Sequence, residues 1–173
     1  MVFRASRRRG SLAGGKFVPN HDELLCIVES LQSQGKVVVF TSGTFDLLHV
    51  GHLRCLRDAK SRGDFLIVGL HSDRGVQRHK HPSMPITPEK ERAELVEALE
   101  CVDYVTMFHE ETAEKVLLKL KPNIYAMGTD YKPTTIPARE AVLSYGGRVL
   151  VTGDTKKHPT TDIMKRGKSL RRL

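Results

Sequence analysis

A short apolar run that leads directly into a glycine turn and a pair of histidines places the strongest constraint on this chain. Lys36–Phe40 is Lys-Val-Val-Val-Phe, a β-branched run typical of a parallel strand buried on both faces. Thr41–His52, which follows without a break, is Thr-Ser-Gly-Thr-Phe-Asp-Leu-Leu-His-Val-Gly-His. If residues 50–62 are helical, the unpaired N–H groups of the first turn point at the end of the strand, where anions bind. The segment therefore predicts a phosphate site at a strand–helix junction.

Two features of this junction indicate chemistry. Gly43 lies where the strand must turn, and glycine adopts backbone angles closed to other residues and lets a ligand approach the main chain. His49 and His52 are three apart, so both rings are expected on one face at the positive end of the helix. Asp46 is expected to brace the turn rather than to take part in chemistry.

Imidazole groups at this place could neutralise charge on a nucleoside triphosphate. When a substrate phosphate attacks the α-phosphate, the nucleophile is already ionised and needs no general base, whereas donors near the phosphate oxygens lower the barrier. The alternative is that each histidine only caps the helix or packs against it. The pairing of His49 with His52, directly after a strand and a glycine turn, favours the catalytic interpretation.

The same residues carry a family resemblance. His49–His52 resembles the HxGH signature of the nucleotidyltransferase superfamily, and Gly43–Asp46 matches the G-x-F-D that precedes it. Other segments, in order over roughly residues 16–166, look like successive blocks of bacterial heptose 1-phosphate adenylyltransferases. These segments are Pro85–Ala93, Ala98–Val105, Lys121–Tyr131, Gly146–Val149 and Thr160–Thr161.

The resemblance implies transfer of AMP from ATP to a sugar 1-phosphate, with release of pyrophosphate and formation of an activated sugar such as ADP-heptose. It implies catalytic roles for His49, His52 and Lys80, and it suggests a homodimer. It assigns contacts with the nucleotide and its phosphates to Thr41, Ser42, Gly43, Thr44, Phe45, Asp46, Gly51, Arg92, Gly128, Asp130, Thr160 and Thr161. Mg²⁺ is expected to arrive with the nucleotide, because the sequence shows no carboxylate cage for a protein-bound metal.

Several of these assignments have a simpler alternative. Lys80 lies in a polar segment that could close over a triphosphate, but a charged loop is often only solvated. Arg92 could be an exposed helix residue beside two glutamates. Asp130 could accept ribose hydroxyls or could be a turn residue. Thr160 and Thr161 could hold the triphosphate or could be an ordinary helix N-cap.

The chain departs from the heptose enzymes in two places. Many of them have Cys at the position of Thr44 and Lys-Gly-Gly-Asp at Met127–Asp130, and both changes resemble glycerol 3-phosphate cytidylyltransferases instead. Those relatives, however, place Arg-Thr-Glu-Gly ahead of Ser-Thr-Thr, whereas Asp154–Thr161 is Asp-Thr-Lys-Lys-His-Pro-Thr-Thr. Because of Thr44 and Met127–Asp130, a CTP-dependent enzyme acting on glycerol 3-phosphate or another phosphorylated alcohol is the first alternative.

Composition bounds the remaining function classes. The chain has 173 residues, 39% of them hydrophobic, and a formal net charge of +8, which suits one domain. The excess charge lies in the ends, since residues 1–15 and 164–173 contain arginines and lysines but no acid. We therefore expect a disordered basic tail over 1–15, a nucleotidyltransferase domain over 16–166 and a basic tail over 167–173. Nucleic-acid binding is not expected to be the main activity, although a non-catalytic interaction module that uses these tails is the second alternative.

The sequence also favours a soluble, cytoplasmic protein. Apolar runs such as Phe65–Val68 are far too short to cross a bilayer, and no secretory apolar region is visible. The arginine-rich start is compatible with an organelle-targeting peptide but lacks an apolar stripe. Cys26, Cys55 and Cys101 have neither metal-site spacing nor an even count, so they indicate neither zinc nor disulfides.

Strands alternate with helices along the whole chain. Strands are expected at 36–41, 65–71, 102–107, 124–127 and 148–152, with helical spacing between them and a long polar connection over 72–86. Asn20, Thr87 and Thr112 are the expected helix caps. This order predicts an α/β, Rossmann-like, doubly wound five-stranded parallel sheet with helices on both faces, in a single domain. Ligands of such sheets bind beyond the carboxyl ends of the strands.

Overall fold

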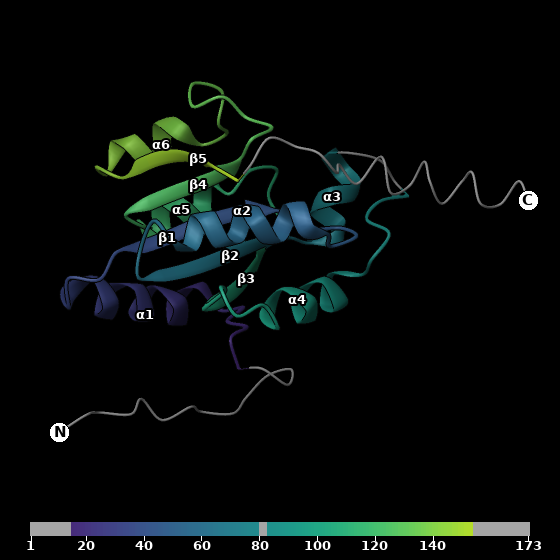
Figure 1. Cartoon of the computed structure of the whole chain (residues 1–173), viewed down its shortest axis with the longest axis horizontal. Coiled ribbons are helices and arrows are strands. Elements are labelled where there is room, and N and C mark those ends of the chain that lie inside the picture. Colours follow the sequence, from purple (N-terminus) through teal and green to yellow (C-terminus); the bar gives the residue numbers. More distant parts are fainter. Residues whose placement is uncertain (1–14, 80–82, 154–173) are drawn as a thin grey trace, which may run out of the picture.

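Five parallel strands form the sheet at the centre of the computed structural model, which describes residues 15–79 and 83–153 (Figure 1). The strands are β1 (Val38–Gly43), β2 (Phe65–His71), β3 (Tyr104–Phe108), β4 (Ile124–Gly128) and β5 (Arg148–Thr152). Their order across the sheet is β3-β2-β1-β4-β5. β1 pairs with β2 on one side and with β4 on the other. The strand order therefore reverses at the carboxyl end of β1, which is where ligands bind in doubly wound sheets.

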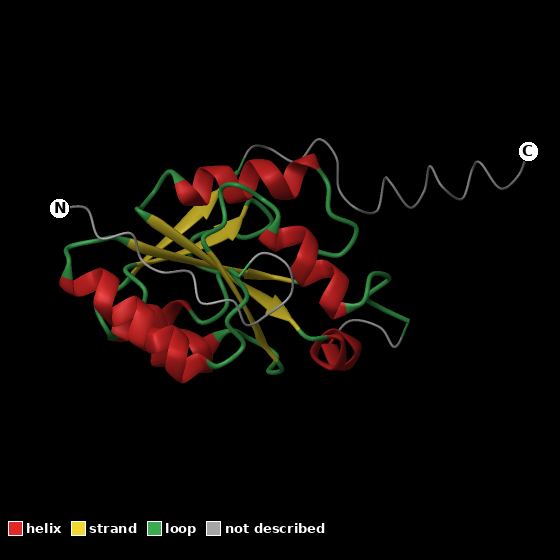
Figure 2. Ribbon diagram, turned by 90° about the horizontal axis from the view of Figure 1, so that it is seen from below, coloured by secondary structure: helices red, strands yellow, loops and turns green. Residues whose placement is uncertain are grey.

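Helices cover both faces of the sheet, as expected (Figure 2). They are α1 (His21–Ser33), α2 (Val50–Lys60), α3 (Asp73–His79), α4 (Glu89–Glu97), α5 (Glu114–Leu120) and α6 (Arg139–Ser144). α1 begins at the expected cap, because the Asn20 side chain accepts hydrogen bonds from the N–H groups of Asp22 and Glu23. Among the described segments, no helix is both long and apolar enough to span a membrane.

The pleat divides the core into two layers. Val38 and Phe40 on β1 point toward α1, α5 and α6, whereas Val39 points toward α2 and α4. On β4, Tyr125 joins the first layer and Ala126 joins the second. Each strand thus buries alternate residues in opposite layers, as a sheet covered on both faces requires.

One helix was not predicted. Residues 72–86 were expected to be a connection without secondary structure, but α3 occupies Asp73–His79. Val76 is its one strongly apolar residue and is only 2% exposed, so the segment has too little periodicity to indicate a helix. The Oγ of Ser72 accepts a hydrogen bond from the N–H of Gly75 and closes the first turn.

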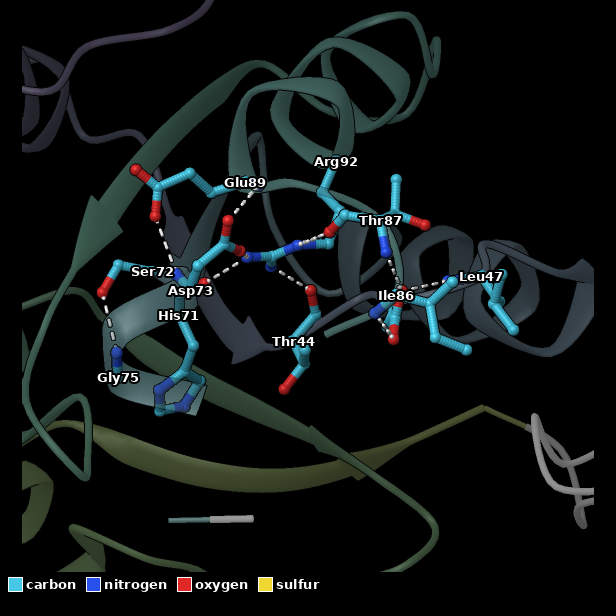
Figure 3. Close-up of polar contacts among 11 residues, drawn as sticks. Thr44, Leu47, His71, Ser72, Asp73, Gly75, Ile86, Thr87, Glu89 and Arg92 are labelled. Carbon is cyan, nitrogen blue, oxygen red and sulfur yellow. Dashed lines mark hydrogen bonds and ion pairs between the residues drawn. The ribbon is translucent and has the colours of Figure 1, made fainter. Parts of the chain in front are cut away.

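α3 and α4 cap each other. The N–H of Asp73 donates to the Glu89 carboxylate at 2.7 Å, and the N–H of Glu89 donates to the Asp73 carboxylate at 3.1 Å (Figure 3). Thr87 was expected to cap α4, but the residue before the helix is Pro88, which makes no side-chain cap. The N-cap position of α5 is Ala113 rather than Thr112, although the Thr112 hydroxyl accepts a hydrogen bond from the N–H of Glu114 at 3.4 Å. A carboxylate from a neighbouring helix replaces the local cap of α4, which sequence spacing alone does not reveal.

The Arg92 side chain joins α4 to the ends of β1 and β2. Its guanidinium is fully buried and donates to the carbonyl oxygens of Thr44, His71 (2.8 Å) and Thr87 (3.0 Å), and to the Asp73 carboxylate at 2.7 Å (Figure 3). The prediction that Arg92 contacts phosphate is therefore corrected, because its donors are directed at three backbone carbonyls and the Asp73 carboxylate. The alternative of an exposed helix residue is also wrong.

Asp46 holds the turn that follows β1. Its carboxylate accepts hydrogen bonds from the N–H groups of Leu47 (3.0 Å), Ile86 (2.8 Å) and Thr87 (2.9 Å). Burial by itself would raise the pKa of Asp46, but the hydrogen bonds from Ile86, Thr87 and Leu47 outweigh it and lower the pKa below its ordinary value. The expected bracing role of Asp46 agrees with these contacts, which tie the turn to the segment before α4.

Replacing Asp46 with Asn should lower the free energy of unfolding by about 1–3 kcal/mol at pH 7, because one amide oxygen cannot accept all three N–H groups. Since the folded pKa is lowered, the carboxylate stabilises the fold above its ordinary pKa of about 4, and this stabilisation disappears as the pH falls through the folded value. As the pH is lowered from neutral to acid, urea unfolding should show that the difference in the free energy of unfolding between wild type and Asp46→Asn becomes smaller. Glu29 is exposed, so Glu29→Gln serves as the control. If the free energy of unfolding of wild type and of Asp46→Asn changed with pH in parallel, the assigned role of Asp46 would be contradicted.

Candidate active site

The two signature histidines lie together at the start of α2. Their rings stack with centroids 3.9 Å apart and an angle of 28° between the planes. His49 is the N-cap residue, and its Nδ1 accepts a hydrogen bond from the N–H of Gly51 at 3.0 Å. The Nδ1 of His52 accepts from the N–H of His49 at 3.4 Å. The sequence prediction that both rings lie on one face of the helix start is confirmed.

These contacts fix the tautomer of each ring. A nitrogen that accepts a hydrogen bond carries no proton, so the neutral imidazole keeps its proton on Nε2. His49 and His52 thus each present an Nε2–H donor. Capping the helix and donating to a ligand use different nitrogens, so the two interpretations of the pair are compatible.

The turn before the histidines has an unusual backbone. Phe45 and Leu47 both have φ in the left-handed region, at 51° and 45°, where residues with side chains are strained. The Phe45 ring packs against His52 with centroids 5.3 Å apart. A Cβ at Gly43 would lie 2.9 Å from that same ring. Gly43 does not have a left-handed φ, so the expectation that it turns the chain is corrected. It is small to leave room for Phe45.

The other residues of the β1 signature have separate positions. Thr41 is buried within the strand and pairs with Val68 and Ala126 on the flanking strands. The Ser42 hydroxyl hydrogen-bonds to the Tyr125 hydroxyl at 2.8 Å. Burial raises the pKa of Tyr125 to about 12, even though the bond with Ser42 acts in the opposite direction, so this pair is uncharged at neutral pH.

The predicted nucleoside residues lie at the end of β4. A Cβ at Gly128 would lie 3.8 Å from the Sγ of Cys55, and Cys55 is one turn beyond His52 on α2. Gly128 is thus beside the histidine helix. Asp130 is exposed in the turn that follows, closed by a hydrogen bond from the N–H of Tyr131 to the carbonyl of Gly128. The structure therefore brings Gly128 close to the signature and leaves Asp130 on the surface. Lys80, Thr160 and Thr161 lie outside the described residues.

A cavity of about 300 Å³ opens beside the signature, at the carboxyl ends of β1, β2 and β4. Ser42, Gly43 and Thr44 line it from the end of β1, and Tyr125 lines it from β4. Tyr125 belongs to the core layer of α5 and α6, and Ser42 is hydrogen-bonded to it, so this part of the cavity lies on that side of the sheet. The histidines begin α2, which packs in the opposite layer. Gly43 and Thr44 therefore lie between the cavity and the histidine pair. In Figure 3 the side chains of Thr44 and His71 point to the same side, away from Arg92.

Several cavity residues were not predicted from the sequence to be site residues. These are His71, Gly75, Glu111, Thr112 and Tyr125. The signal that could have found most of them is position, because His71, Glu111 and Thr112 lie at or just after the carboxyl ends of their strands. Tyr125 is hidden within an apolar strand, where an aromatic residue indicates core packing first.

Comparison with curated proteins finds relatives that are much longer than this chain. The chain is 44% identical over 149 residues to "Bifunctional protein HldE" of Pelobacter propionicus and 44% identical over 147 residues to the protein of that name from Geobacter metallireducens. The alignments cover 86% and 85% of this chain but only 30% of each relative. The chain thus corresponds to less than a third of the length of these relatives.

Solved structures show the same fold. The lipopolysaccharide core biosynthesis protein from Thermoplasma volcanium matches with a TM-score of 0.61 and 27% identity, covering 70% of this chain and all of that one. Pantoate-beta-alanine ligase from Francisella tularensis matches with a TM-score of 0.58, over 88% of this chain and 76% of its own. At 17% identity the second match concerns the fold alone.

The sequence model of one family covers most of the sheet and the whole signature. It describes cytidylyltransferase-like proteins and matches residues 40–168, a span that starts in β1 and includes both histidines and Gly128. With the HxGH pair at the strand–helix junction, the chain belongs to the cytidylyltransferase-like family.

Proposed function

We propose that this protein is a nucleotidyltransferase that transfers AMP from ATP to a sugar 1-phosphate of the heptose 1-phosphate kind, with release of pyrophosphate. The observation that carries the proposal is the stacked histidine pair with both Nδ1 atoms held by backbone N–H groups at the start of α2. Family membership and the similarity to HldE proteins support the reaction class and the acceptor.

The chemistry needs charge stabilisation more than proton transfer. An oxygen of the acceptor phosphate forms a bond with the α-phosphorus, the bond from that phosphorus to the bridging oxygen breaks, and pyrophosphate leaves with the electron pair. Negative charge increases on the α-phosphate oxygens and on the leaving group. The Nε2–H groups of His49 and His52 and the positive end of α2 are suited to meet that charge, since their hydrogen bonds to backbone hold them in place before the reaction.

The two substrates are proposed to approach from different sides of β1. The triphosphate lies over the start of α2, with the nucleoside toward Gly128. The acceptor occupies the cavity lined by Ser42 and Tyr125, with its phosphate at Gly43 and Thr44. Phosphorus and nucleophile then meet at the tip of the strand, where the cavity borders the histidine pair.

Mg²⁺ is proposed to enter bound to the triphosphate and to neutralise oxygens that the protein does not reach. Asp46, the carboxylate of the signature, does not suit a metal-binding role because its oxygens accept three backbone N–H groups. The ion would therefore take its ligands from phosphate oxygens and water.

A CTP-dependent enzyme is the second candidate, and Thr44 together with Met127–Asp130 favours it. Pyrophosphate release should be measured with ATP and CTP, each against heptose 1-phosphate, a hexose 1-phosphate and glycerol 3-phosphate. We expect the highest kcat/KM with ATP and a sugar 1-phosphate. A preference for CTP with glycerol 3-phosphate would replace the proposal by this candidate. No release with any pair would favour a non-catalytic protein.

Replacing His52 with Ala should lower kcat by about a hundredfold or more, as the loss of one preorganised donor does. Two further variants separate donation from helix capping. In His52→Asn the amide oxygen can replace Nδ1 as acceptor, but nothing replaces the distal donor, so stability should be kept and turnover lost. In His52→Gln the amide nitrogen can replace Nε2, so part of the turnover should return. Normal turnover in His52→Asn would contradict the assigned role.

A further inference from the structure

The Ser42 hydroxyl contacts two other residues of the same cavity. Ser42, Tyr125 and Met127 all line the cavity beside the signature. The Ser42 Oγ is 2.8 Å from the Tyr125 hydroxyl and 3.8 Å from the Met127 sulfur. Tyr125 is paired with Phe40, two residues before Ser42, so its ring extends along the sheet from the core layer of α5 and α6 to reach this hydroxyl. These contacts hold the Ser42 hydroxyl at the carboxyl end of β1, beside Gly43.

Burial makes Tyr125 the donor in its hydrogen bond with Ser42. Tyr125 is only 1% exposed, and among the described residues Ser42 is the one hydrogen-bond partner of its hydroxyl. If Ser42 donated instead, the phenol proton would be buried without an acceptor, which costs free energy. Burial also raises the pKa of Tyr125 to about 12, so the phenol keeps its proton at neutral pH. The Ser42 oxygen therefore accepts this hydrogen bond.

The proton of Ser42 is left with a weak acceptor. Because its oxygen accepts from Tyr125, the Ser42 hydroxyl can donate to the Met127 sulfur, which is 3.8 Å away. A thioether is a weak acceptor, so an oxygen of a ligand in the cavity can replace it at little cost. The hydrogen bond from Tyr125 also polarises the Ser42 hydroxyl and makes it a better donor. Ser42 thus offers a directed donor to a ligand in the cavity.

The position of Ser42 next to the proposed phosphate site determines which oxygen of the acceptor it can reach. The acceptor phosphate is proposed to lie at Gly43 and Thr44, and Ser42 precedes Gly43 on β1, about 3.3 Å away along the strand. A group within reach of Ser42 is therefore only a few bonds from the phosphorus. In a sugar 1-phosphate the nearest hydroxyl is the one at C2, on the carbon next to the carbon that bears the phosphate.

We propose that Ser42 is a specificity-determining residue that donates a hydrogen bond to the C2 hydroxyl of the acceptor, and that Tyr125 is the positioning residue that directs the Ser42 proton into the cavity. This inference rests on the proposed function and narrows its substrate class to phosphate esters with a hydroxyl on the neighbouring carbon. A site that donates to a substrate hydroxyl rejects the analogue without it, because the donor then loses its strong partner.

The test compares a hexose 1-phosphate with its 2-deoxy and 6-deoxy analogues. With ATP as the nucleotide, the wild-type kcat/KM for pyrophosphate release should be lower by about tenfold or more for the 2-deoxy analogue than for the parent. In Ser42→Ala the values for these two acceptors should agree within about twofold, because neither can accept from the missing hydroxyl. The ratio of parent to 6-deoxy analogue should be the same in both proteins, since C6 is far from the phosphate.

Tyr125→Phe tests the direction of the hydrogen bond between the two hydroxyls. It keeps the ring in the core layer but removes the phenol proton, so the preference for the parent over the 2-deoxy analogue should fall part of the way. Because Tyr125 acts through Ser42, adding Tyr125→Phe to Ser42→Ala should not lower the preference further. If Ser42 donated to Tyr125, the substitution would release the Ser42 proton to the ligand. An unchanged or higher preference in Tyr125→Phe would therefore show that the positioning role is wrong.

Ser144→Ala and Tyr104→Phe are the matched controls. They remove the same groups from residues that do not line the cavity. The Ser144 hydroxyl donates to the carbonyl of Ala141 at 2.7 Å on α6, and Tyr104 lies at the start of β3. Both variants should have the wild-type preference for the parent over the 2-deoxy analogue. Thermal unfolding of all the variants checks that no substitution alters the fold.

Calorimetric titration of the three acceptors, without nucleotide, separates the possible failures. If the parent binds and reacts but Ser42→Ala keeps the wild-type preference, the assignment of Ser42 is wrong and the proposed function stands. If wild type uses the 2-deoxy analogue as well as the parent, the assignment is equally wrong. If no sugar 1-phosphate binds or reacts, the proposed function fails and this inference fails with it.

Discussion

The buried guanidinium of Arg92 fixes the distance between the ends of β1 and β2 and the start of α4. It satisfies three carbonyl oxygens and one carboxylate at once. Without Arg92, these partly buried acceptors would lose their shared donor, and without these acceptors Arg92 would be a buried cation with no partner. Neither side of this arrangement can be changed alone, so the backbone at Thr44 and His71, which border the cavity, is held in one position.

The segment that follows Thr44 stores strain where the chemistry is proposed. Left-handed backbone at Phe45 and Leu47 costs free energy, and the three hydrogen bonds of Asp46 between them compensate for it. The same turn directs the Phe45 ring onto His52. Helix capping by His49 and His52 then completes the site, so the groups proposed to stabilise charge are also the groups that start α2.

Patterns in the sequence predicted what depends on local periodicity. The five strands, the two-sided helical cover and the placement of the histidine pair are confirmed, because alternation and spacing determine which side each residue faces. Contacts between distant segments could not be predicted. The burial of Arg92 depends on carbonyl groups at residues 44, 71 and 87, which only the fold brings together. α3 was missed because its first turn is closed by Ser72 and by Glu89 from another helix.

The position of the strand tip between two layers has a stereochemical consequence for the proposed reaction. A nucleophile arriving through the cavity and a leaving group lying over α2 would be on opposite sides of Gly43 and Thr44. That arrangement fits an in-line displacement within a ternary complex. It calls for inversion of configuration at phosphorus and leaves no step for a nucleotidylated protein intermediate.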